Sequence, residues 1–176
     1  MSVIRRKFAA SEVLHLTDDG RTPNNERLPL VIYRDALPID DADPATACEA
    51  LFARHGWGGA WRDGIYDYHH FHATTHEVLG IVAGEASVRF GGENGKTVRL
   101  RQGDVVVIPA GVGHKRESAS DELLVVGAYP GGFEFDMATP QEDHVKALRA
   151  LYRVPLPAED PVYGPGGPLL EHWRRN

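Results

Sequence analysis

The stretch that decides the fold is Gly64–Gly84, which reads GIYDYHHFHATTHEVLGIVAG and contains four of the nine histidines of this 176-residue chain. Its first half, residues 65–72, is rich in aromatic side chains and predicts a β-strand. Alternate side chains of a strand point to the same face, so His70 and His72 would lie side by side. The stretch therefore predicts two imidazoles directed at one point.

A carboxylate follows these histidines at a short distance along the chain. A polar turn, Ala73-Thr74-Thr75, separates them from Glu77, which begins an apolar run that continues to Ala83. If the two runs form a hairpin, Glu77 returns beside His70 and His72. Two neutral imidazoles and a carboxylate that converge in this way are typical ligands of a divalent metal ion.

A second stretch, Gly103–His114, offers one more ligand. It reads GDVVVIPAGVGH, a β-branched run followed by a Pro/Gly turn and a histidine. Proline and glycine at Pro109 and Gly111 favour a sharp reversal of the chain directly before His114. A histidine on a rigid turn after a strand is well placed to be the fourth ligand.

The two stretches resemble the paired motifs of the cupin superfamily. The residues that match the first motif are Gly64, His70, His72, Glu77 and Gly84. Those that match the second are Gly103, Pro109, Gly111 and His114, with Ser118 where the family usually has Asn. The phrase HHFHATTHEVLG also resembles a subgroup of uncharacterised bacterial YjlB-like cupins, a resemblance that implies no activity. The superfamily resemblance implies an all-β core, a jelly-roll barrel or double-stranded β-helix with a few flanking helices.

The pattern of the whole chain agrees with that fold class and predicts one domain over residues 1–176. Six or seven short runs of strand type, separated by turn signals, occupy about 60–135, which is typical of an antiparallel sandwich or barrel. An N-terminal extension carries a helix over about 44–55, and a C-terminal helix spans about 140–152. The Pro/Gly-rich tail from Pro155 keeps enough apolar residues to wrap the barrel or cross to a second subunit, so we expect a homodimer.

Composition excludes several classes of protein. The net charge is −6 and no block of Lys or Arg occurs, so a nucleic-acid partner is not expected. A single cysteine, Cys48, excludes an internal disulfide framework and fits a reducing compartment. No signal-peptide pattern and no apolar run of about 20 residues is found, so we expect a cytoplasmic protein that makes no contact with a membrane.

Two further histidines of the first stretch need separate interpretation. His76 precedes Glu77, so in a strand it faces the opposite side and packs on the outside of the barrel. If the preceding turn is one residue tighter, His76 replaces Glu77 as a ligand. His69 faces away from His70 in the same manner, and we interpret it as structural.

Four other residues are candidates for the lining of the site. Tyr66 and Tyr68 share the predicted face of the two histidines, where they either donate hydrogen bonds to a bound molecule or belong to the core. Leu79 and Ile81 share the face of Glu77 and would make the surroundings of the ion apolar.

The predicted function is that of a small metalloprotein. Three histidines and one glutamate suit Fe, Mn, Ni or Zn and leave one or two coordination positions for a small oxygen-bearing molecule. The cupin resemblance implies dioxygenase-, isomerase- or decarboxylase-like chemistry, and the sequence indicates no catalytic residue outside the ligand set. Two alternatives stay open: a non-catalytic module that binds a metal or small molecule, and a metal-free sugar isomerase or epimerase with histidine as the base.

Overall fold

The computed structural model describes residues 8–132, 134–140 and 144–174. Its strands are β1 Ser11–Leu16, β2 Asn25–Tyr33, β3 Trp57–Asp63, β4 Glu77–Ala83, β5 Glu85–Phe90, β6 Lys96–Arg101, β7 Val105–Ile108, β8 His114–Ala119 and β9 Leu124–Pro130. Its helices are α1 Pro44–Arg54, α2 His144–Leu151 and α3 Pro168–His172. None of the described helices is long and apolar enough to cross a membrane.

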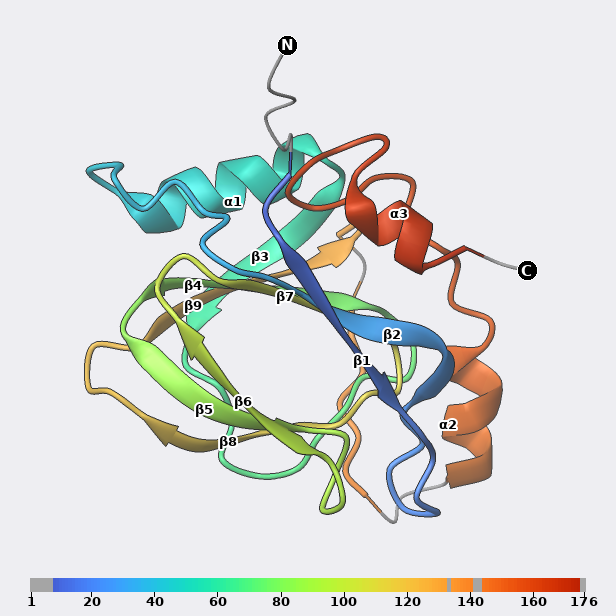
Figure 1. Ribbon diagram of the computed structural model, residues 1–176. Coiled ribbons are helices and arrows are strands. Elements are labelled where there is room, and N and C mark those ends of the chain that lie inside the picture. Colours follow the sequence, from blue (N-terminus) through green and yellow to red (C-terminus); the bar gives the residue numbers. More distant parts are fainter. Residues whose placement is uncertain (1–7, 133, 141–143, 175–176) are drawn as a thin grey trace, which may run out of the picture.

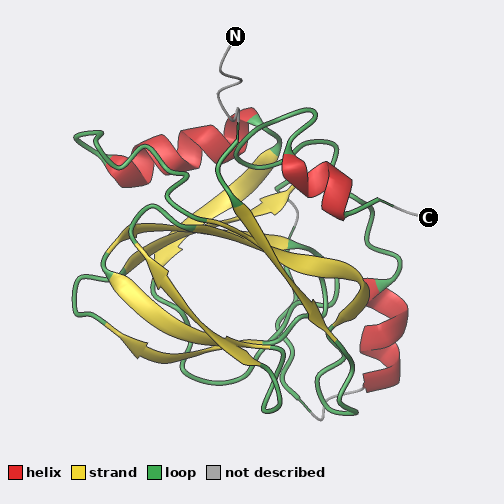
Figure 2. Ribbon diagram, in the orientation of Figure 1, coloured by secondary structure: helices red, strands yellow, loops and turns green. Residues whose placement is uncertain are grey.

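Two antiparallel sheets face each other and form the barrel (Figure 1). The larger has the strand order β1-β2-β7-β4-β9-β3, and the smaller has the order β6-β5-β8. The described helices lie outside the two sheets (Figure 2). The predicted fold class, an all-β jelly-roll barrel with a few flanking helices, is therefore confirmed.

Strand β4 lies at the centre of this arrangement because both of its faces are buried. Leu79 and Ile81 belong to the core between the two sheets, whereas Val78 and Val82 belong to a second core under α1 and α3. A Cβ atom at Gly80 would lie 2.7 Å from the Sγ atom of Cys48 on α1, so the helix sits directly on the sheet. Burial on both faces explains why this run is almost continuously apolar.

The barrel includes more of the chain than the predicted range of about 60–135. Strands β1 and β2 belong to the larger sheet, in which Val31 of β2 pairs with Val107 of β7. The reason lies in the apolar run of β2. Leu30 faces the core between the sheets, and Val31 faces the core under the helices, so the strand is buried on both sides like its neighbours.

The predicted strand over residues 65–72 is wrong. Residues 64–76 are irregular and form only isolated bridges, between His70 and His114 and between Phe71 and Ala138. The backbone of this segment bonds to several separate elements instead of one ladder. The His70 N–H donates to the His114 carbonyl at 3.2 Å, and the Phe71 N–H donates to the Ala138 carbonyl at 2.9 Å.

The C-terminal tail packs on its own chain. Leu169 and Trp173 are buried in the core under the helices, and the indole N–H of Trp173 donates to the carbonyl of Pro29 at 2.7 Å. Of the two predicted courses for the tail, the structure shows the one that wraps the barrel. Helix α2 ends at Leu151, and the expected start of that helix, at about 140, falls partly at 141–143, outside the described residues.

One buried carboxylate fastens the tail to the sheet. Asp160 is fully buried and accepts hydrogen bonds from the hydroxyl of Tyr33 at 2.5 Å and from the backbone N–H groups of Val162, Tyr163 and Leu169 at 2.8, 3.0 and 3.1 Å. Burial and the neighbouring Asp160 raise the pKa of Tyr33, so its hydroxyl stays protonated and keeps donating.

The substitution Asp160→Asn tests the role of this carboxylate. The amide group turns one acceptor into a donor that faces N–H or O–H donors, so we expect the free energy of unfolding to fall by about 2–3 kcal/mol. Urea unfolding at pH 7 measures it, with Asp40→Asn at an exposed position as the control. Equal stability of the two variants would contradict this account of the tail.

Candidate metal centre

A cavity of about 660 Å³ opens between the two sheets. Its walls come from β3, β4 and β9 of the larger sheet, from β8 of the smaller sheet and from the irregular segment before β4. The inner end carries titratable side chains, and aromatic and aliphatic side chains surround them. The lining includes His70, His72, Glu77, Leu79, His114, Arg116, Tyr129 and Phe135.

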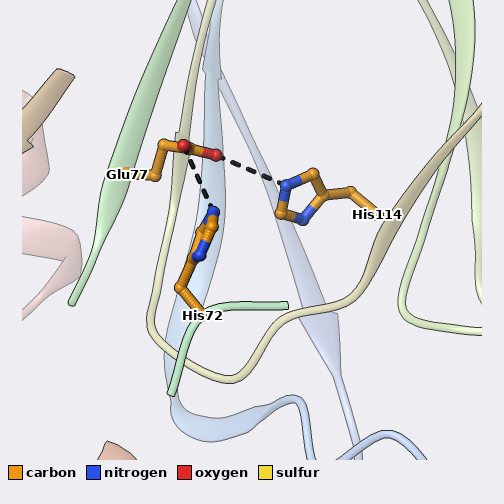
Figure 3. Close-up of side chains that lie close together, drawn as sticks. All are labelled: His72, Glu77 and His114. Atoms are coloured by element: carbon orange, nitrogen blue, oxygen red, sulfur yellow. Dashed lines mark ion pairs between the residues drawn. The ribbon is translucent and has the colours of Figure 1, made fainter. Parts of the chain in front are cut away.

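Three of the predicted ligands line this cavity, and Figure 3 shows their side chains pointing toward one another. His72, Glu77 and His114 each offer one ligand atom, and these atoms lie within 4.8 Å of one another. The Nε2 atoms of His72 and His114 each lie 3.3 Å from an oxygen of Glu77. Glu77 begins β4, His114 begins β8 and His72 comes from the segment before β4, so three parts of the chain position the cluster.

The other ring nitrogen of each histidine faces a backbone carbonyl. The acceptors are Tyr68 at 3.0 Å for His70, Asp136 for His72, and Val112 at 3.1 Å for His114. A carbonyl only accepts hydrogen bonds, so each Nδ1 carries the proton. When such a ring is neutral, its Nε2 atom holds a lone pair, which is the form that binds a metal ion.

The electrostatics of the cluster favour a cation. Burial would raise the pKa of Glu77, but the facing rings of His72 and His114 lower it, so the carboxylate stays ionised. Burial would likewise lower the pKa of His72, but Glu77 raises it. A buried carboxylate that faces two lone pairs is repelled unless a proton or a metal ion lies between them. The residues present therefore fit a divalent ion.

The remaining predicted ligand, His70, lies beside the cluster. Its ring centroid is 4.0 Å from that of His114 and 6.1 Å from that of His72, and the side chain lines the cavity. It does not belong to the group of atoms within 4.8 Å. Burial, together with the nearby His114, lowers the pKa of His70 to about 3, so this ring is neutral at physiological pH.

His76 and His69 lie outside the cluster. His76 is fully buried on the other side of the chain from Glu77. Its Nδ1 accepts from the N–H of Ala110 at 2.9 Å, and its ring centroid lies 4.7 Å from that of Trp173. Glu77, and not His76, therefore faces the cavity. His69 turns its Nε2 to Glu93, at 3.0 Å.

Of the four residues predicted to line the site, two belong to the lining of the cavity and two do not. Tyr66 and Leu79 line the cavity. Tyr68 is 43% exposed and Ile81 is buried deeper in the core, and neither is part of the described lining. Tyr66 is itself 49% exposed, because the segment that carries it is not a strand of the barrel wall.

Tyr129 is a part of the site that the sequence interpretation missed. It belongs to β9, the neighbour of β4, and its hydroxyl accepts from the indole N–H of Trp61 at 2.9 Å. Burial and the nearby Glu77 raise the pKa of Tyr129, so its hydroxyl remains protonated. The alternation of β9 could have indicated it, because every second side chain of that strand faces the barrel interior.

Asp136 is a second such residue, and it positions the loop that carries His72. Its backbone carbonyl accepts from His72, and its carboxylate accepts from the N–H groups of Ala73 and Thr74 at 3.0 and 2.9 Å. A loop 63 residues away in sequence from Ala73 therefore fixes the orientation of the ring. No local pattern in the sequence signals this contact.

Comparison with known proteins agrees with the fold and the motifs. Residues 62–127 match the family model of the cupin domain. The chain is 46% identical over 157 residues to the uncharacterized protein YjlB of Bacillus subtilis (strain 168), an alignment that covers 89% of this chain and 92% of that relative.

Two solved structures show a low level of similarity to this chain. An acireductone dioxygenase from Bacillus anthracis with a cadmium ion in its active centre is 20% identical, with a TM-score of 0.36 over 48% of this chain and 58% of that one. An oxalate decarboxylase of Bacillus subtilis is 20% identical, with a TM-score of 0.36 over 63% of this chain and 22% of that one. The chain thus spans less than two thirds of either structure. With the paired motifs, the barrel and the extensive identity to YjlB, this chain belongs to the cupin superfamily, in the same family as YjlB.

Proposed function

We propose that the protein binds one divalent transition-metal ion through His70, His72, Glu77 and His114 and acts on a small oxygen-bearing molecule held in the barrel cavity. The observation that carries this proposal is the convergence of three buried ligand atoms within 4.8 Å of one another. The chemistry expected of such a site is that of a dioxygenase, an isomerase or a decarboxylase.

The donor set supports a transition metal of intermediate character. Imidazole nitrogen and carboxylate oxygen suit Mn, Fe, Ni and Zn, whereas Ca²⁺ and Mg²⁺ prefer oxygen ligands alone. The one cysteine, Cys48, lies against Gly80 on the opposite face of β4, so no thiolate reaches the cavity. The Nδ1 of His70 already donates to Tyr68, so that ring has only Nε2 left for an ion.

The residues around the proposed ion supply apolar surface and a hydroxyl group that a bound molecule can contact. The ion would polarise an oxygen of the bound molecule and hold it in place. Leu79 and Phe135 provide apolar surface in the cavity lining, and Phe135 stacks on Tyr129 at a centroid distance of 4.8 Å. Trp61 donates to the oxygen of Tyr129, which leaves the proton of Tyr129 free to bond Glu77 or a bound molecule.

A second candidate function is a non-catalytic binding module. It is favoured by the lining itself, in which the described imidazole groups and the one buried carboxylate, Glu77, are the proposed ligands. An enzyme would turn over its small molecule only with metal bound, whereas a module would return it unchanged.

Removal of a ligand tests the metal proposal. Elemental analysis of protein purified without chelator or affinity tag should find about one equivalent of a divalent transition metal. We expect Glu77→Gln and His114→Ala to lower metal affinity by well over tenfold, because each removes a donor from a small coordination shell. His69→Gln and Glu93→Gln, which face away from the cavity, serve as matched controls and should keep the ion. Wild-type affinity in the Glu77 and His114 variants would contradict the proposal.

Metal affinity should also fall as the pH decreases through about 6. Each histidine binds an ion only as neutral imidazole, so protons compete with the metal once the pH approaches the pKa of the ring. Glu77 raises the pKa of His72 above its ordinary value, so this competition begins at higher pH there than at His70. Occupancy measured after dialysis at pH 7.5, 6.0 and 4.5 checks the trend, and full occupancy at pH 4.5 would be inconsistent with histidine ligands.

A further inference from the structure

Arg116 extends the cluster along strand β8. It follows His114 by two residues, so the two side chains share a face. In the pairing with β5, His114 lies opposite Phe90 and Arg116 lies opposite Val88, and both β5 side chains belong to the core between the sheets. Arg116 therefore faces the interior of the barrel, and it lines the same cavity as the proposed metal ligands.

The guanidinium group of Arg116 is poorly satisfied. Its Nε atom is buried and has no hydrogen-bond partner among the described residues. Its charged contact is with Asp67, whose oxygen lies 3.8 Å from Nη2, beyond hydrogen-bond distance, on a side chain that is 73% exposed. Exposed pairs of this kind contribute little, and an unpaired buried N–H is costly. The group would gain from an anion that enters the cavity.

The other arginine of the described lining, Arg62, has hydrogen-bond partners for its guanidinium group. Arg62 donates from Nε to the carboxylate of Glu49 and from Nη2 to the hydroxyl of Thr46 at 3.0 Å. Its Nε and Nη2 groups are thus engaged by its own chain. Between the two arginines of the lining, Arg116 is the one available to a ligand.

The charge of the cavity changes when the proposed ion is bound. Glu77 offsets only one of the two charges of a divalent ion, and Arg116, whose side chain is 37% exposed, adds a positive charge in the same cavity. The acidic residues Asp63 and Asp121 also line the cavity, but both are exposed to solvent, where their charges are screened. The inner end would therefore attract an anion.

We propose that Arg116 determines specificity by binding the carboxylate of an anionic substrate, a second oxygen of which coordinates the ion. The planar guanidinium group matches a carboxylate with two parallel hydrogen bonds. The cavity, at about 660 Å³, is large enough for such a molecule, and Tyr129 and Phe135 offer aromatic surface for its body. The substrate class is then small carboxylates that carry an oxo or hydroxyl oxygen. This inference rests on the proposed function.

Binding of a matched pair of probes tests the inference. We choose benzoylformate, an oxo-carboxylate with an aromatic body, and its neutral amide, benzoylformamide, and titrate each into cobalt(II)-loaded protein. Calorimetry gives the affinity, and the visible spectrum of cobalt reports coordination. The wild type should bind the acid at least about tenfold more tightly than the amide, which is the size expected of hydrogen bonds to a charged group.

The variant Arg116→Gln removes the charge and should weaken binding of the acid by roughly tenfold to a hundredfold while leaving the amide unchanged. Arg116→Lys keeps the charge but loses the planar group that forms two parallel hydrogen bonds, so its affinity for the acid should lie between those of the wild type and Arg116→Gln. The matched control is Arg62→Gln, which lines the same cavity and should bind both probes as the wild type does.

Cobalt affinity, measured separately for each variant, distinguishes the two proposals. If the wild type does not bind cobalt, the proposed function itself fails. Suppose that the wild type and Arg116→Gln bind cobalt equally, but the wild type binds the acid no more tightly than the amide or binds neither probe measurably. The metal proposal then survives, and the inference about Arg116 is wrong. An unchanged affinity for the acid in Arg116→Gln overturns it as well.

Discussion

The structure depends on one arrangement of charge, the carboxylate of Glu77 buried opposite the Nε2 atoms of His72 and His114 at 3.3 Å. Burial of an ionised carboxylate is costly unless a cation or several donors compensate for lost water. Here the backbone carbonyls hold one proton of each ring on Nδ1, so Nε2 of a neutral ring presents a lone pair to the carboxylate. A cation between the three groups removes the conflict, and this is why we interpret the cluster as a metal centre.

The rest of the fold holds these three groups in place. Strand β4 is buried on both faces and begins with Glu77, so the carboxylate stands on a rigid element. His114 follows a turn in which Gly111 has a φ of 90°, a conformation that other residues rarely adopt. Asp136 fixes the segment that carries His72. The side chains of the site thus owe their positions to backbone hydrogen bonds from distant parts of the chain.

Motif spacing and alternation predicted much of the fold and part of the site. The apolar runs of β4 and β7 indicated buried strands, and the spacing of His72, Glu77 and His114 indicated their convergence. The same alternation failed for residues 65–72, because their backbone bonds to three different elements and not to one partner strand. The site also needs partners such as Asp136, whose contacts depend on tertiary structure and leave no periodic signal.

Anomalous diffraction tests the central claim most directly. Crystals grown with Mn²⁺ and measured at a wavelength where manganese scatters anomalously should show one strong peak. The account predicts that this peak lies about 2.0–2.3 Å from the Nε2 atoms of His72 and His114 and from an oxygen of Glu77, as is usual for nitrogen and oxygen ligands of a transition metal. The absence of a peak between these three side chains, or a peak bound elsewhere in the barrel, would contradict it.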